Sequence, residues 1–302
     1  MRAMVAKYPG DRVLIGETYL PNTAEMDKWY GGAAKNELQL PMDMIVGFSD
    51  HKLDASLFRK RIEEVETQIH GSQPLLVFDN HDNVRSMDRY SDGVHDAAIA
   101  RLLATVLLTS KATALMYYGE ELGMTTATPV RKEDVKDPIG ITGWPKEKGR
   151  DGERTPMQWD STNAQAGFST NATPWLAVPG NYKSLNVQAE LADPDSLLNW
   201  YKRLIHLRRE LPALHDGGEM MLDRTNANVL SYVRTRPLGA AAVVVALNMS
   251  AQPQAISLDV AGAGVKGTQA HTVLSDDPSA GTTVMLDHIT LPPFGAWVGT
   301  VQ

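Results

Sequence analysis

Short apolar runs alternate with helical patterns in the first part of the chain, and this alternation constrains the fold more than any other feature. The four runs are Arg12 to Gly16, Leu38 to Val46, Leu75 to Phe78 and Ala112 to Tyr118. Between the second and third runs, apolar residues recur at helical spacing behind Asp54, which we expect to cap that helix. A more apolar helix is expected from Asp92 to Lys111. Strands that alternate with helices in this way predict a parallel sheet or barrel.

The residue pattern changes in the second part of the chain. Residues 122–193 mix Gly, Pro, Asn, Trp and charged residues without a period, which is typical of a functional loop or lid, or of a stretch with small elements that the pattern does not reveal. An amphipathic helix is expected from Asp195 to about Leu211. It is followed by β-branched runs at short spacing: Val229 to Thr235, Ala241 to Leu247, Ala255 to Val260, His271 to Leu274, Thr283 to Leu286 and Ala296 to Val301. These runs predict an antiparallel β-sandwich. We therefore divide the chain into residues 1–216, an α/β part with the long loop 122–193, and residues 217–302, the sandwich.

The composition disfavours several classes of protein. Of the 302 residues, 43% are hydrophobic, which is enough for a sizeable core. The net charge is −7 and no run is rich in Lys and Arg, so we expect no nucleic-acid partner. The sequence has no cysteine, which excludes disulfides and is compatible with a cytoplasmic protein. No apolar stretch of about 18 residues or more occurs, so we expect no membrane span.

Polar and acidic side chains stand at the ends of two of the expected strands. Glu17 ends the first run, and Asn80, His81 and Asp82 follow the third. Parallel barrels place their chemistry at such strand ends, and two carboxylates from two strands suggest acid/base work on a glycosidic bond. Burial among apolar neighbours would raise the pKa of Glu17 and suit it to protonate a leaving oxygen. Gly16 would let another chain or a ligand approach the backbone closely.

Each of these features also has a purely structural interpretation. Glu17 could cap a helix or form a salt bridge, and the Asn-His-Asp run could be a turn network. A metal site at Asp79, His81 and Asp82 is less favoured because no second His completes a facial triad, so we expect no metal and no cofactor. The loop from Arg150 to Asp160 is dense in charge and aromatics. Its arginines could hold a sugar hydroxyl or a carboxylate, or could form a salt bridge within the loop.

Four motifs that occur in order along the chain together resemble one family. They are Glu17 in Val-Leu-Ile-Gly-Glu-Thr, Asp82 in Phe-Asp-Asn-His-Asp, the segment Tyr117-Tyr118-Gly119-Glu120-Glu121, and the Arg-Asp-x-x-Arg-Thr-Pro-Met-Gln-Trp-Asp loop that begins at Arg150. With them the chain is similar to the α-amylase superfamily of glycoside hydrolases (family 13), and within it to the α-glucosidase and oligo-1,6-glucosidase branch. The resemblance covers nearly the whole chain. It implies the C-terminal half of a TIM (β/α)8 barrel, strands five to eight, followed by the antiparallel β-sandwich.

The resemblance also implies roles for individual residues. Glu17 would be the general acid/base, and Asp82 the second carboxylate, which grips sugar hydroxyls and stabilises the transition state. His81 would hydrogen-bond the same sugar. Arg150, or with less support Arg154, would fix the non-reducing glucose, and Arg85 would support the active site. Together these roles imply a retaining hydrolase that removes terminal α-glucosyl residues from short oligosaccharides.

One part of the family's pattern does not occur in the sequence. The family's nucleophile is an Asp within Gly-x-Arg-x-Asp, upstream of the Glu strand, and no such pattern precedes Glu17. A retaining glycosidase needs this nucleophile about 5–5.5 Å from the acid/base. We therefore expect the chain alone to be inactive or nearly so: a truncated product, one begun at an internal Met, or half of a homodimer that pairs through exposed barrel edges. The alternatives are a transglucosylase or isomerase on the same scaffold, and a non-catalytic sugar-binding or assembly half-barrel.

Overall fold

The structure is a computed structural model that describes residues 1–48, 52–236 and 239–302. The chain forms two compact units, each made of several segments. Unit 1 comprises residues 1–77, 105–115 and 204–302, and unit 2 comprises residues 78–104 and 116–203. This division cuts across the expected one at residue 216, because the C-terminal sheet shares a unit with the first strands of the chain.

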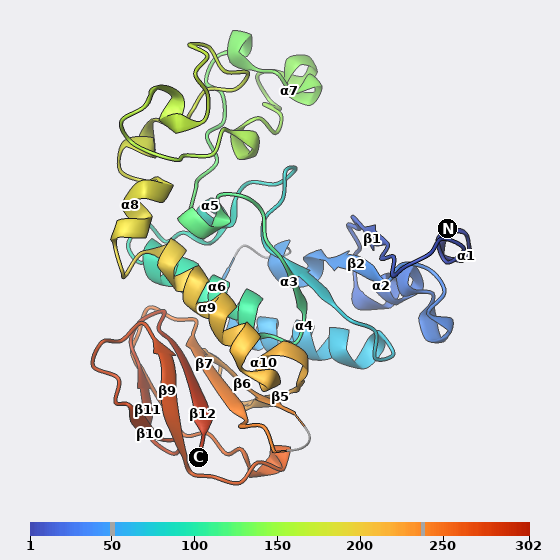
Figure 1. Ribbon diagram of the computed structural model, residues 1–302, viewed down its shortest axis with the longest axis vertical. Coiled ribbons are helices and arrows are strands. Elements are labelled where there is room, and N and C mark those ends of the chain that lie inside the picture. The colour runs from blue at the N-terminus through green and yellow to red at the C-terminus, as the bar shows by residue number, and fades with distance from the viewer. Residues whose placement is uncertain (49–51, 237–238) are drawn as a thin grey trace. The chain divides into compact units, whose positions relative to one another are not determined.

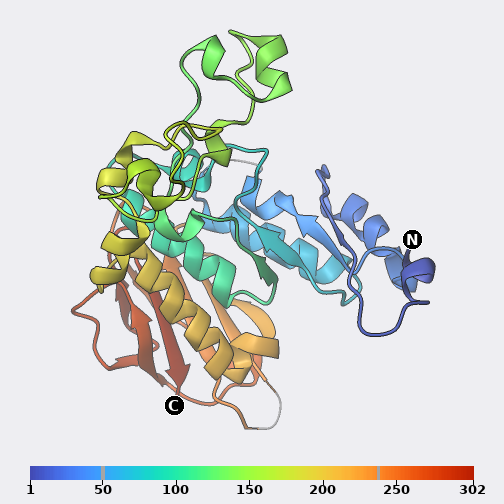
Figure 2. The ribbon, with the colours of Figure 1, turned by 45° about the horizontal axis from the view of Figure 1, so that its top comes forward.

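A four-stranded parallel sheet lies in unit 1, in the order β1-β2-β3-β4 (Figures 1 and 2). The strands are β1 (Ile15–Gly16), β2 (Leu40–Asp43), β3 (Leu75–Val77) and β4 (Thr113–Leu115). Every neighbouring pair is parallel, so the predicted parallel sheet is confirmed. β3 is buried throughout, whereas Ile15 of β1 is 54% exposed at the edge of the sheet.

Several helices lie wholly within unit 1. They are α1 (Arg2–Val5), α2 (Thr23–Tyr30), α3 (Met44–Phe48), α4 (Ala55–Gln68) and α10 (Pro212–Asp216). The predicted cap of α4 is confirmed, since the Asp54 carboxylate accepts a hydrogen bond from the Leu57 backbone N–H at 3.0 Å. Buried residues of α2 pack against the last turns of α4 to form one apolar cluster, which consists of Met26, Tyr30, Val65 and Ile69.

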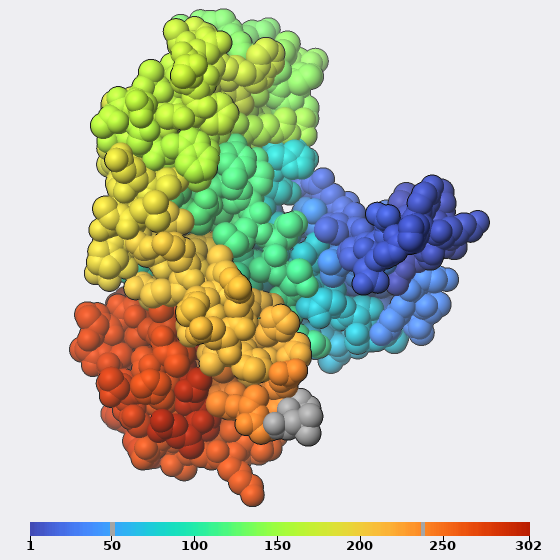
Figure 3. All heavy atoms as spheres, in the orientation of Figure 1, coloured from blue at the N-terminus to red at the C-terminus, as the bar shows by residue number. Residues whose placement is uncertain are grey.

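The C-terminal residues form an antiparallel sheet of six strands in the order β10-β9-β12-β7-β6-β5 (Figure 1), and they appear in orange and red in Figure 3. A separate antiparallel pair, β8 and β11, contributes Ile256, Ile289 and Leu291 to one apolar core with residues of the six-stranded sheet, so the predicted antiparallel strands are confirmed. The strands are β5 (Gly218–Leu222), β6 (Val229–Thr235), β7 (Val243–Asn248), β8 (Gln254–Ile256), β9 (Gln269–Ser275), β10 (Thr283–Met285), β11 (Ile289–Leu291) and β12 (Ala296–Val301).

Unit 2 is built from helices and irregular chain. Its helices are α5 (Ser86–Tyr90), the first turns of α6 (Asp96–Thr109), α7 (Pro138–Gly143), α8 (Val187–Ala192) and the first turns of α9 (Leu197–Glu210). The indole N–H of Trp200, on α9, donates to the Arg101 carbonyl of α6 at 3.2 Å. The stretch 122–193 carries α7, α8 and several single 3-10 turns, which its sequence did not predict. Among the described residues, no helix has the length and apolar character needed to cross a bilayer.

A buried arginine braces α4 against the chain that leads into β6. The Arg59 side chain is 4% exposed, and its guanidinium donates to the carbonyls of Arg224, Asn226 and Val229 at 3.1, 2.7 and 2.8 Å. All four residues belong to unit 1. A buried cation is tolerated when such acceptors replace its water. The contact therefore ties the parallel part of unit 1 to the C-terminal sheet.

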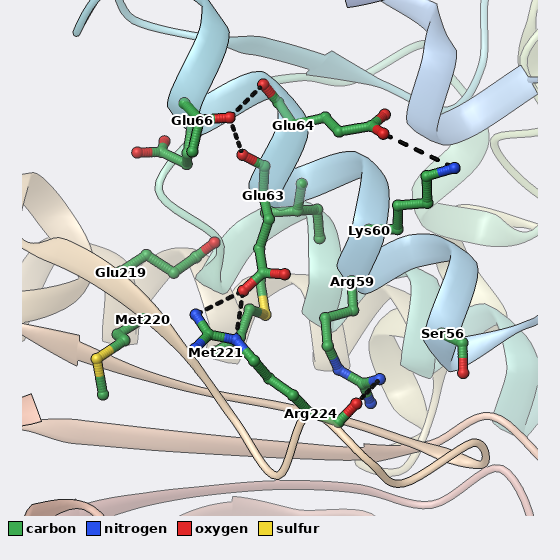
Figure 4. A pocket seen from close by; sticks show the side chains of 12 residues that line it. Ser56, Arg59, Lys60, Glu63, Glu64, Glu66, Glu219, Met220, Met221 and Arg224 are labelled. Atoms are coloured by element: carbon green, nitrogen blue, oxygen red, sulfur yellow. Dashed lines mark hydrogen bonds and ion pairs between the residues drawn. The ribbon is translucent and has the colours of Figure 1, made fainter. Parts of the chain in front are cut away.

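A pocket of about 650 Å³ lies beside this brace, between α4 and β5 (Figure 4). Glu66 of α4 and Glu219 of β5 both line it. Lys111 contacts both carboxylates. Its ammonium pairs with Glu66 Oε2 at 2.6 Å, and its backbone N–H donates to Glu219 Oε2 at 2.8 Å. Burial raises the pKa of Glu219 to about 7, while Arg234 opposes the rise.

This raised pKa makes stability depend on pH. The unfolded chain loses the Glu219 proton near pH 4.5, whereas the folded chain keeps it to about pH 7. Stability should therefore fall as the pH rises through that window. We expect Glu219→Gln, which keeps an oxygen for the Lys111 N–H, to be more stable than the parent at pH 8 and to lose this advantage near pH 4. Urea denaturation at both pH values measures the difference. The exposed Glu37→Gln is the control, and an equal effect of both variants would contradict the expectation.

Candidate functional site

A buried carboxylate, that of Asp79, anchors the segment that follows β3. Asp79 accepts from the Ser86 backbone N–H at 2.5 Å and from the Ser86 hydroxyl at 3.0 Å. Arg89 Nη1 lies 3.4 Å from Asp79 Oδ1, and both side chains are almost fully buried. Burial raises the pKa of Asp79, and Arg89 opposes this rise. These contacts fix both ends of the turn that carries His81 and Asp82.

The turn itself is organised by Asn80. Its side-chain oxygen accepts from the backbone N–H groups of Asp82 and Asn83, each at 3.0 Å, and from the Asn83 side chain at 2.9 Å. Asn favours such turns because its side chain can stand in for a backbone acceptor. The structural interpretation of the Asn-His-Asp run as a turn network is thus confirmed. The network nevertheless leaves His81 and Asp82 to project from it.

Asp82 lies between two arginines of the Arg150 loop. Its Oδ1 accepts from Arg150 Nη1 and from Arg154 Nη2, each at 2.7 Å. His81 Nε2 is 3.5 Å from the same oxygen, and Arg154 Nε donates to the His81 carbonyl at 2.7 Å. No described residue donates to Asp82 Oδ2. The structure therefore brings together His81, Asp82, Arg150 and Arg154, which the sequence names as candidate site residues.

Arg150 is held in place by a second, fully buried carboxylate. Asp137 Oδ2 accepts from Arg150 Nε and from the Arg150 backbone N–H, both at 2.8 Å, and Oδ1 accepts from Nη2 at 3.2 Å. The Arg150 contact lowers the pKa of Asp137, and the same contact raises the pKa of Arg150. Asp151 in turn accepts from the Asp137 backbone N–H at 3.0 Å. These ion pairs reach outside the Arg150 to Asp160 loop and present Arg150 to Asp82.

Arg85 is placed differently from the expectation of a substrate-binding residue. Its side chain is fully buried, and it donates to the carbonyls of Tyr118 and Glu153 at 2.8 and 2.9 Å. Its guanidinium carbon lies 5.1 Å from the ring centre of Tyr117 and equally far from that of Tyr118. A guanidinium enclosed in this way is not available to a ligand, so Arg85 is not a substrate-binding residue, and its contacts fit a supporting role.

Glu120 is a functional-site neighbour whose role sequence reasoning missed. It belongs to the 3-10 turn η2 (Glu120–Leu122), and its carboxyl receives hydrogen bonds from the Tyr201 hydroxyl at 2.9 Å and the Tyr117 backbone N–H at 3.1 Å. Burial, followed by the nearby charge of Asp79, raises the pKa of Glu120 to about 8. The only sequence signal was its place in the Tyr-Tyr-Gly-Glu-Glu motif.

Glu17 follows β1 in unit 1 and is exposed. Its Oε1 lies 3.5 Å from the Tyr19 hydroxyl. The expected burial among apolar neighbours is wrong, since the flanking Ile15 is also exposed. Gly16 lets another segment of the chain approach the backbone closely, since a Cβ at this position would lie 2.1 Å from Leu38 Cδ1. The space beside Gly16 is thus filled by Leu38 and not kept for a ligand.

We call His81, Asp82, Arg150 and Arg154 the Asp82 cluster. Together with the fold, this cluster defines a class of proteins: α/β proteins with acidic and basic side chains in the loops that follow parallel strands. Residues 1–217 match the family model of the alpha-amylase catalytic domain. The chain therefore belongs to the alpha-amylase family, as its four motifs predict.

Relatives and solved structures agree with this assignment. The chain is 36% identical over 245 residues to a probable alpha-glucosidase of Rhizobium meliloti, covering 79% of this chain and 41% of that protein. It is 31% identical over 276 residues to an oligo-1,6-glucosidase of Bacillus cereus, covering 80% and 48%. The trehalulose synthase structure from Pseudomonas mesoacidophila superposes with a TM-score of 0.79 at 26% identity, over 97% of this chain and 56% of that one. The chain thus spans about half the length of the proteins it matches.

Proposed function

We propose that this chain carries the sugar-gripping and acid/base residues of an α-glucosidase-type retaining glycoside hydrolase that acts on terminal α-glucosyl residues of short oligosaccharides. The observation that supports the proposal most directly is the arrangement of hydrogen bonds around the Asp82 carboxylate. Arg150 and Arg154 share its Oδ1, while Oδ2 receives no hydrogen bond from a described residue. A carboxylate that is oriented by two cations and keeps one oxygen open can accept hydrogen bonds from sugar hydroxyls.

Three further residues receive roles in this proposal. Glu17, at the end of β1, is the general acid/base that protonates the leaving oxygen. His81 binds the same sugar as Asp82, beside which its ring lies. Arg150 fixes the terminal glucose, and its orientation comes from the buried Asp137. The exposed Glu17 carboxylate is compatible with a group that must reach a substrate.

We further propose that the four-stranded sheet represents strands five to eight of a (β/α)8 barrel. Its strands are parallel, adjacent in chain order and connected through helices, as barrel strands are. The printed sequence contains no Gly-x-Arg-x-Asp pattern, and we propose that these 302 residues alone do not supply the nucleophile of the covalent step. The chain by itself should then bind sugar without hydrolysing it, unless a second copy or another chain joins the sheet edge at β1 or β4.

A transglucosylase or isomerase is the second candidate. The observation in its favour is the structural likeness to a trehalulose synthase and to the isomaltulose synthase of Erwinia rhapontici, the latter at 25% identity and a TM-score of 0.79. The two relatives compared above bear the names of glucosidases, which is why hydrolysis is preferred. Product analysis separates the two, because only hydrolysis releases free glucose from a sucrose-like substrate.

Titration of the purified chain with 1-deoxynojirimycin, a cationic glucose-shaped inhibitor, tests the proposal. We expect measurable binding that weakens at least about tenfold in Asp82→Asn, because charge-assisted hydrogen bonds contribute about 1.5–3 kcal/mol. The exposed Asp287→Asn is the matched control and should bind as the parent does. An inhibitor that does not bind, or that binds Asp82→Asn equally well, would contradict the proposal.

Hydrolysis of p-nitrophenyl α-glucoside completes this test. The chain alone should release no nitrophenol above background, at low and at high protein concentration. Release that Glu17→Gln abolishes would refute the claim of inactivity and would favour completion of the site by pairing. Release confined to high concentration, with a doubled mass in solution, would identify the partner as a second copy.

A further inference from the structure

Glu120 carries a buried carboxyl group that the roles assigned above do not use. The residue is 5% exposed, and two elements hold its side chain. The Tyr201 hydroxyl of α9 donates to Glu120 Oε1 at 2.9 Å, and the Tyr117 backbone N–H donates to Oε2 at 3.1 Å. All three residues belong to unit 2. A buried side chain that joins a loop to a helix in this way fixes the loop in one position.

A second buried carboxylate, that of Asp79, lies near enough for its charge to act on Glu120. Asp79 accepts two hydrogen bonds from Ser86 and pairs with Arg89, and these contacts hold the turn of the Asp82 cluster. Two carboxylates in one buried region ionise together only at high cost. Among the described residues, no cation donates to Glu120, so the negative charge belongs on Asp79 and the proton on Glu120.

A second series of contacts connects Glu120 with the arginine side of the Asp82 cluster. Tyr117, whose backbone N–H donates to Glu120, also donates from its hydroxyl to the Glu153 carbonyl at 3.3 Å. Glu153 directly precedes Arg154 in the 3-10 turn η4 (Gly152–Arg154). The Arg154 guanidinium in turn donates to Asp82 Oδ1 at 2.7 Å. The position of Glu120 therefore bears on both sides of the cluster: the turn after β3 and the loop that carries the arginines.

We propose that Glu120 is a positioning residue for the Asp82 cluster, and that it holds the cluster in its binding geometry only while its carboxyl group is neutral. Burial, followed by the charge of Asp79, raises the pKa of Glu120 to about 8, and the hydrogen bonds from Tyr117 and Tyr201 oppose this rise. Above that pH two negative charges would share a buried region in which only Asp79 has a cation. The inference rests on the proposed function for its ligand.

Every element around Glu120 contributes a charged or titratable group to this region. These groups are Asp79 after β3, Arg85 and Arg89 at the start of α5 and within it, Glu121 in η2, and Tyr201 on α9. Both arginines act on Asp79 and favour its charged form. Burial raises the pKa of Tyr201 well above its usual value, so this hydroxyl keeps its proton while Glu120 titrates.

Calorimetric titration with isomaltose at pH 7 and pH 9 tests the inference, because this neutral sugar does not itself titrate there. If only neutral Glu120 holds the cluster, the parent should bind about tenfold more weakly at pH 9 than at pH 7. Glu120→Gln, which stays neutral, should bind as the parent does at pH 7 and keep that affinity at pH 9. Glu133→Gln, at an exposed position of unit 2, is the matched control and should follow the parent.

Tyr201→Phe is a second variant with its own expected result. It removes a hydrogen bond that lowers the pKa of Glu120, so the pH at which the affinity falls should rise. This variant decides the question if Glu120→Gln does not fold: a rise supports the inference, and an unchanged pH overturns it. Affinity that falls equally with pH in the parent and in Glu120→Gln also overturns it.

Hydrogen exchange separates this inference from the proposed function, since it needs no ligand. Short deuterium pulses, measured by mass spectrometry on a peptide spanning residues 79–86, should exchange faster in the parent than in Glu120→Gln at pH 9, and equally fast at pH 7. If this difference appears but isomaltose does not bind, the proposed function is refuted and the positioning role of Glu120 stands. Equal exchange in the two proteins at both pH values overturns the positioning role, whatever the sugar does.

Discussion

Replacing Arg89 by Met is expected to lower the free energy of unfolding by about 3–5 kcal/mol, because it leaves the buried Asp79 without its cation. The Arg89 side chain is 3% exposed and that of Asp79 is 1% exposed. The same guanidinium also donates to the carbonyls of Phe78 and Val84. Its loss would release the turn that carries His81 and Asp82. Urea denaturation followed by circular dichroism measures the change.

Two companion variants make this expectation specific. Arg89→Lys keeps the charge but cannot reach Asp79 and both carbonyls at once, so we expect an intermediate loss. Arg131→Met removes an exposed arginine that pairs with Asp134 at 2.7 Å and should leave the urea midpoint nearly unchanged. If Arg89→Met were as stable as Arg131→Met, the buried pair would not hold this turn.

Replacing Arg234 by Met is expected to cost a similar amount, about 3–5 kcal/mol, in the other unit. The Arg234 side chain on β6 is fully buried. It donates to the carbonyls of Thr109, Gly217 and Gly218 at 2.5, 2.9 and 3.2 Å. Methionine fills a similar volume but donates no hydrogen bond, so buried carbonyls lose their donor. The loss of these hydrogen bonds in a buried site lowers the free energy of unfolding. The measurement is again the urea midpoint.

The matched control for Arg234 lies two positions along the chain. Arg236 pairs with Asp216 at 3.0 Å, but both side chains are nearly half exposed. Arg236→Met should therefore cost only about 0–1 kcal/mol. Equal losses in the two variants would mean that the loss reflects charge at this end of β6 and not the buried contacts of Arg234.

Periodic sequence patterns made much of the fold predictable. Asp54 and the apolar spacing behind it marked α4, and β-branched alternation marked β6 and β12, because local chemistry decides these elements. β5 escaped prediction, since Gly-Glu-Met-Met-Leu has no β-branched residue and forms a strand only by pairing with β6. The assignment of residues 204–302 to the same unit as the first strands depends on contacts far apart in sequence, which no local pattern encodes.

The sequence identified residues of the candidate site, but it did not predict all of their ion-pair partners or their exposure to solvent. His81, Asp82, Arg150 and Arg154 were identified because their motifs are contiguous in the sequence. Asp137 was missed, because it lies in a stretch without a period and meets Arg150 only through tertiary folding. The exposure of Glu17 could not be read from its apolar neighbours, because a run of this kind does not tell whether its strand lies inside a sheet or at an edge.

The Arg59 brace bears on how members of this family can be recombined. The match to the catalytic domain ends at residue 217, yet all three carbonyls that accept from Arg59 lie beyond that point. A chain cut there would keep a buried guanidinium and lose every acceptor it uses. A sheet transplanted from a relative would have to offer three carbonyls in the same places. The end of the match to the catalytic domain is therefore not a boundary of independent folding.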